Sequence, residues 1–166
     1  MYNKTQGGKI FMASKEVKDY LNTVVATQGQ FYVRLHQFHW YVKGPHFFTL
    51  HEKFEELYDE VTENLDEVAE RLLAIGGEPY STMEEFIEHS VIEERVEDKN
   101  LSEDEMVEAV VKDLETIGKS LDEGILLTDE HEDFPSNDML IAMKEDVDKH
   151  LWMLKAYLGK EADAEV

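Results

Sequence analysis

The chain has no cysteine among its 166 residues. It can therefore form neither a disulfide nor a thiolate metal site, and histidine, aspartate and glutamate remain as the side chains that could hold a metal. No apolar run approaches the roughly 20 residues that a helix needs to span a membrane. Residues 1–14 also lack the continuous apolar core of a signal peptide. We therefore expect a cytoplasmic protein that does not contact a membrane.

Basic side chains are scarce, because 16 lysines and arginines stand against 38 acids, which gives a formal net charge of −22. An acidic surface repels DNA phosphates and attracts cations, although a surface that is merely well solvated has the same composition. The first fifteen residues are the exception, with Lys4, Lys9 and Lys15 and no acid. We expect a flexible N-terminal tail over 1–13, one domain over 14–160 and an acidic tail over 161–166.

Four long stretches carry apolar residues at helical spacing, and none shows the strict alternation of a strand. The sequence therefore predicts an all-α protein. Ser14 is the expected N-cap of the first helix, and a capping box that begins at Thr49 is expected to start the second. The third should follow Ser102, and the fourth should start near Asn137 and stop at Gly159.

The connections between these helices differ in length. The first and third connections are short, whereas the second is long and contains a short helix, predicted from a capping box at Ser81 to about His89. A long crossover between the second and third helices is typical of a ferritin-like four-helix bundle.

Four side chains suited to metal binding share one stripe of the second helix. At 100° per residue, Glu55, Asp66 and Glu70 lie at about 40°, 60° and 100° from His51, and the apolar residues lie near 240° to 320°. The stripe therefore faces away from its own bundle. A solvated acidic face, which has no binding role, is the alternative interpretation.

One chain cannot close a metal site with this stripe, because a rise of 1.5 Å per residue separates His51 from Asp66 by roughly 22 Å. The four positions are, however, symmetric about the point between residues 60 and 61. An antiparallel copy related by a twofold axis would set His51 and Glu55 opposite the partner's Glu70 and the partner's Asp66. Imidazole beside carboxylates is a ligand set suited to ferrous iron.

Three segments resemble the Dps family: His36 to Tyr41, Gly44 to Lys53 and Asp66 to Arg71. The ferroxidase pattern of that family is a His-Trp pair, a histidine twelve residues later, an acid four later, and Asp and Glu eleven and fifteen beyond. Its ligand positions fall here on His39, His51, Glu55, Asp66 and Glu70. The resemblance continues through 137–140 and 150–153.

The resemblance implies a dodecameric shell built from twofold dimers, which oxidises Fe(II) with hydrogen peroxide or dioxygen and stores ferric oxide. It also implies an intersubunit centre in which His39 and His51 of one chain meet the partner's Asp66 and the partner's Glu70. Glu55 departs from the usual Asp of the family. Its extra methylene would shift the second metal or leave this residue bonded through water.

Similar proteins admit iron through threefold pores lined by acids from the turn between the third and fourth helices. By this resemblance we assign Asp129 and Asp138 to the pore, and Phe134 stands where another pore acid is expected. A solvated acidic loop is the alternative. Trp40 resembles a redox-active tryptophan of the family, with a core aromatic as the alternative. The remaining histidines are predicted to be structural or surface residues: His36, His46, His89, His131 and His150.

Three classes of function stay open at the level of sequence. The first is an iron-storing ferroxidase that protects DNA from oxidative damage. The second is a nucleoid protein that compacts DNA through its tail lysines, although the net charge and the acidic end oppose this, so we expect weak or no DNA binding. The third is a metal-free bundle that acts as an adhesin or antigen, in which the stripe has no role.

Overall fold

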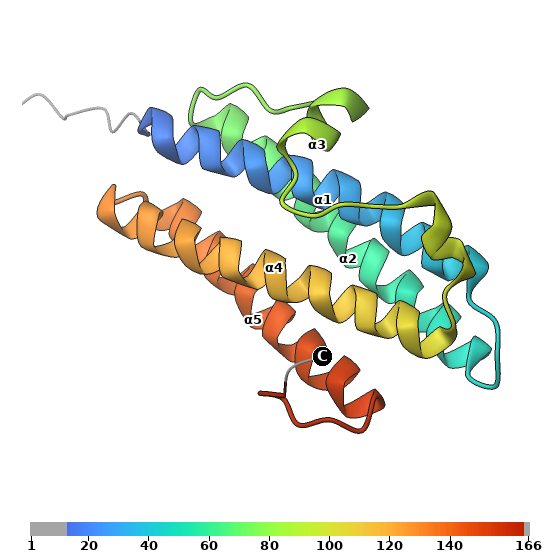
Figure 1. Ribbon diagram of the computed structural model, residues 1–166. Coiled ribbons are helices and arrows are strands. Elements are labelled where there is room, and N and C mark those ends of the chain that lie inside the picture. The colour runs from blue at the N-terminus through green and yellow to red at the C-terminus, as the bar shows by residue number, and fades with distance from the viewer. Residues whose placement is uncertain (1–12, 165–166) are drawn as a thin grey trace, which may run out of the picture.

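Five α-helices and one 3₁₀ helix make up the regular structure of residues 13–164, the part of the chain that the computed structural model describes (Figure 1). The long helices are α1 (Lys15–Tyr41), α2 (Phe47–Ala74), α4 (Glu103–Glu130) and α5 (Phe134–Tyr157). The short helices α3 (Met83–His89) and η1 (Val96–Asn100) lie in the connection between α2 and α4. No strand occurs among these residues, so the predicted all-α class is confirmed. Lys4 and Lys9 of the predicted tail lie outside the described residues.

The four long helices form the predicted ferritin-like bundle, with the crossover between α2 and α4. The most extensive packing joins α1 to α2 and α4 to α5, and α3 packs on α1 (Figure 1). The core is mainly apolar, and its largest fully buried side chains include Phe31, Phe38 and Phe54. No helix in the described part of the chain combines the length and the apolar composition needed to cross a bilayer.

Two of the predicted helix starts are confirmed and three are wrong. Ser14 caps α1 by accepting from the Val17 N–H at 3.2 Å, and Ser102 caps α4 within a capping box. The second helix starts at Phe47, so Thr49 lies inside its first turn. The capping box of α3 begins at Thr82, one residue after Ser81.

The predicted start of the last helix near Asn137 is also wrong, because α5 begins three residues earlier, at Phe134. Asp133 is its N-cap and accepts from the Ser136 N–H at 3.3 Å. Pro135 fits the first turn, where a backbone N–H would have no partner within the helix.

A buried ion-pair cluster fixes the crossover to the bundle. Arg34 of α1 contacts Asp98 of η1 at 2.7 Å and also binds Asp113 of α4 through Nε. Burial raises the pKa of Asp113 to about 6, against the opposing effect of Arg34. The Gln37 amide also donates to the Arg95 carbonyl at 3.0 Å. The crossover is thereby held on α1 and α4, and the outer face of α2 stays open.

Candidate metal site

The turn between α1 and α2 brings two predicted ligands together. His39 lies in the last turn of α1 and His51 early in α2, and their rings stack with centroids 3.7 Å apart and an interplanar angle of 16°. Nδ1 of His39 lies 2.7 Å from the His51 carbonyl oxygen, and Nδ1 of His51 lies 2.8 Å from the His39 carbonyl oxygen.

These two hydrogen bonds determine which nitrogen of each ring can bind a metal. A carbonyl oxygen only accepts hydrogen bonds, so each Nδ1 must carry a proton and donate. In a neutral imidazole the lone pair then lies on Nε2, which is the atom left to coordinate a metal ion. Each histidine therefore orients the other through the backbone.

Aromatic side chains surround this pair. Tyr58 meets the His39 ring edge to face at 5.2 Å, and Phe47 stacks on His51 at 5.0 Å. Burial, followed by the carboxylates of Glu55 and Asp59, raises the pKa of Tyr58. His39 is only 8% exposed as a result of this packing. Neither Tyr58 nor Phe47 was singled out in the sequence, because their stacking depends on how the two helices meet.

Trp40 does not belong to the core of the four-helix bundle. Its side chain is 68% exposed and lies 5.2 Å from the ring of His36, so the core alternative for this residue is wrong. Tyr41 and Phe48 are also exposed, at 49% and 83%. An exposed aromatic group therefore stands beside the histidine pair on the surface of the bundle.

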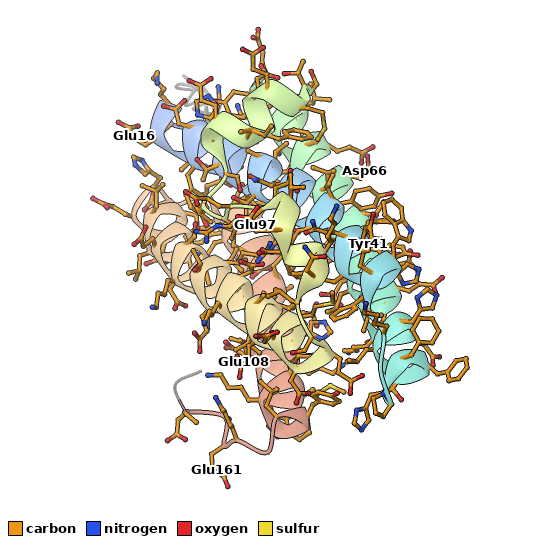
Figure 2. The ribbon with its side chains drawn as sticks, turned by 45° about the vertical axis from the view of Figure 1, so that its right-hand side comes forward. Glu16, Tyr41, Asp66, Glu97, Glu108 and Glu161 are labelled. Carbon is orange, nitrogen blue, oxygen red and sulfur yellow. The ribbon has the colours of Figure 1, made fainter. Side chains whose placement is uncertain are left out.

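The predicted acidic ligands lie on the outside of α2. Glu55, Asp66 and Glu70 are all exposed, as the helical wheel predicts. Figure 2 shows Asp66 on the same side of the molecule as Tyr41, beyond the bundle core. Within residues 13–164 no three histidines or acids come close enough to share a metal ion. Of the five predicted ligands, only His39 and His51 lie next to each other within one chain.

The predicted pore residues lie at the end of the bundle where α4 turns into α5. Asp129 and Asp138 are exposed there, and Phe134 is 61% exposed. Asp133 belongs to the same acidic turn but is fully buried, where it binds Arg71 at 2.7 Å and caps α5. Its role is structural.

Two further histidines make contacts that join helices. His150 is 3% exposed, and its Nε2 lies 2.8 Å from a carboxylate oxygen of Glu60, which links α5 to α2. His46 contacts Glu103 at the start of α4. No spacing in the sequence pairs these residues, because each contact joins segments that are far apart along the chain.

The chain matches the family model of the ferritin-like domain over residues 18–163. This span is most of the chain, which is therefore a ferritin-like protein. The DNA protection during starvation protein of Listeria monocytogenes is 50% identical over 147 residues, which are 89% of this chain and 94% of that protein. General stress protein 20U of Bacillus subtilis is 46% identical over 146 residues, which are 88% of this chain and 99% of that protein.

Solved structures show the same relationship. The X-ray structure of Dps from Listeria monocytogenes matches with a TM-score of 0.87 at 50% identity, covering 90% of this chain and 97% of that one. Dps from Staphylococcus aureus matches with a TM-score of 0.84 at 46% identity, covering 88% and 97%. The chain belongs to the Dps family, the DNA protection during starvation proteins.

Proposed function

We propose that this protein is a ferroxidase that oxidises Fe(II), preferably with hydrogen peroxide, and stores the ferric oxide inside a dodecameric shell. The observation that carries the proposal is the His39–His51 pair. Both rings commit Nδ1 to a backbone carbonyl, which leaves two Nε2 atoms available for metal beside an outward acidic stripe. Iron in this scheme is the substrate and the stored cargo.

The partner chain of a twofold dimer would complete the site. Two imidazoles alone bind iron weakly, whereas added carboxylates give the mixed nitrogen and oxygen ligand set that ferrous iron accepts. Asp66 and Glu70 face outward, where an antiparallel α2 of a second chain would bring them to the histidine pair. Glu55 would bind the second iron, directly or through water.

Similar proteins support this choice of histidines. Solved structures of Listeria innocua Dps include variants in which two histidines twelve residues apart are replaced by glycine, singly and together. His39 and His51 have the same separation of 12 residues. Crystals of that protein have also been soaked with zinc and with cobalt.

The proposed chemistry pairs two Fe(II) ions with one peroxide. Each Fe(II) gives one electron, the O–O bond breaks, and two protons are taken up to form two water molecules without release of hydroxyl radical. Asp129 and Asp138 would line the entry pore, and the acidic interior would raise the local cation concentration. Trp40 would supply an electron when only one Fe(II) is bound.

Anaerobic titration of Fe(II) with hydrogen peroxide tests the proposal. We expect two Fe(II) oxidised per peroxide in the presence of the protein, without the hydroxyl radical that a spin trap detects in protein-free buffer. One Fe(II) per peroxide with an undiminished radical signal would contradict paired oxidation. If the shell took up no iron at all, a metal-free role would be favoured.

We propose that DNA is protected by removal of iron and peroxide, and that the shell does not coat the nucleoid. The net charge of −22 opposes contact with phosphates. In a gel-shift experiment at physiological salt and neutral pH, the intact shell should leave plasmid DNA unretarded. A retarded complex that disappears when residues 1–13 are removed would instead identify the tail as a DNA-binding element.

A further inference from the structure

The turn that joins the two histidine-bearing helices is held by a residue from a third helix. Glu103, the first residue of α4, accepts from Nδ1 of His46 at 2.6 Å and from the His46 backbone N–H at 3.1 Å. His46 is the N-cap of α2, and its side chain makes no capping bond to α2 itself. The carboxylate of Glu103 therefore binds the chain at the point where α2 begins.

The surroundings of this contact are built to admit the carboxylate. Gly44 has φ +146°, and a Cβ at this position would collide with Oε2 of Glu103. The Glu103 side chain is only 13% exposed although it is acidic. The hydrogen bond from the His46 side chain lowers the pKa of Glu103, so the group stays ionised near neutral pH.

We propose that Glu103 is a positioning residue for the metal site and acts through His46 on the geometry of the histidine pair. This inference rests on the proposed function. His46 lies between His39 and His51 on the turn that connects them. Because each of these rings donates to the backbone carbonyl of the other, both orientations depend on the distance between the end of α1 and the start of α2.

This mutual arrangement makes the pair sensitive to a small movement of the turn. If α2 shifts along its axis relative to α1, both Nδ1–carbonyl distances change, and with them the orientation of both rings and of both Nε2 atoms. Displacements of about 1 Å at a reactive centre can cost on the order of a hundredfold in rate. Glu103 opposes such a shift because it attaches the turn to α4, which belongs to the other helix pair of the bundle.

The test is a Co²⁺ titration of the assembled shell, monitored by visible absorption at 25 °C. Glu103→Ala should weaken Co²⁺ binding on the order of tenfold, the lower end of the effect of losing an outer-sphere partner, and should change the shape of the absorption band at saturation. Glu103→Gln keeps an oxygen that can accept from the His46 N–H, and should restore most of the affinity. Glu108→Ala is the matched control on α4 and should match the native chain.

A purely structural role for Glu103 gives a different result. In that case Glu103→Ala lowers the melting temperature but leaves both the Co²⁺ affinity and the band shape unchanged, which would overturn the proposal. Glu103→Gln separates the hydrogen bond from the charge. Like Glu103→Ala, it removes the negative charge from the first turn of α4, but it keeps an oxygen that can accept from His46.

Failure of the proposed function can be recognised separately. The metal assignment fails if the native shell binds no Co²⁺, or if the Asp66→Ala shell binds as much Co²⁺ as the native shell. Whether Glu103 positions the turn is then tested without metal, by measuring backbone amide hydrogen exchange over residues 42–51. Exchange there should be at least about tenfold faster in Glu103→Ala than in Glu108→Ala, because the turn opens locally. Equal rates in the two variants would overturn the positioning role.

Discussion

We expect the Asp66→Ala shell to assemble but to oxidise iron more than about a hundredfold more slowly than the native shell. This is the expected result because a direct ligand contributes more than the outer-sphere groups whose loss costs up to about a hundredfold. Asp66 is exposed on α2, so its removal should change the stability of the subunit by no more than about 0.5 kcal/mol. Stopped-flow absorbance after mixing Fe(II)-loaded shells with peroxide measures the rate, and light scattering measures assembly.

Glu67→Ala is the matched control for this substitution. Glu67 is the next residue on α2 and is also exposed, but it lies about 100° around the helix from Asp66 and outside the stripe. The control should oxidise iron at the native rate. If Asp66→Ala were as fast as Glu67→Ala, Asp66 would not be a ligand and the stripe would be an ordinary solvated face.

The bundle core could be predicted from the sequence because burial repeats with the helical period. The apolar residues of the second helix were predicted to share one face, and Leu50, Phe54, Leu57 and Val61 on that face are buried. This pattern depends only on residues that are close along the chain. The long crossover and its short helix were also predicted, but η1 was not, because Val96–Asn100 is held by Arg34 from a distant segment.

Helix starts were predicted less well than helix faces. Thr49, Ser81 and Asn137 all have side chains that cap helices well, but a nearby residue begins the helix in each case. At α2 the N–H of His46 is bound by Glu103 from α4, so the helix can start before Thr49 without a local cap. At α3 and α5 the caps are local, but Thr82 and Asp133 take the place of the nearby Ser81 and Asn137.

The candidate site likewise has features that the sequence predicted and features that it could not predict. The helical wheel predicted that the acidic stripe faces outward, and Glu55, Asp66 and Glu70 are exposed. The reciprocal bonds of the histidine pair could not be predicted, because they depend on how α1 and α2 meet. The exposure of Trp40 was left open for the same reason.

The proposed twofold origin of the site leads to a complementation experiment. A chain with His51→Ala retains its acids, and a chain with Asp66→Ala retains its histidines, so each forms an inactive shell alone. When both are co-expressed in equal amounts, a mixed dimer contains one site with both defects and one site with none. About one quarter of all sites should then be intact if subunits pair at random. The mixed shells should therefore oxidise iron at about one quarter of the native rate.

An intrachain site gives no recovery in this experiment, because every chain carries a defect in its own ligand set. Shells that are assembled separately and then mixed should also stay inactive, which controls for contamination by native protein. A second mixture tests independently whether the ligands are shared between chains. When native chains are co-expressed in equal amounts with a chain carrying both substitutions, about one quarter of all sites in the shells should be intact if ligands are shared, but about one half if each chain binds iron alone. Agreement of both mixtures on one quarter would establish that His51 and the partner's Asp66 act in the same centre.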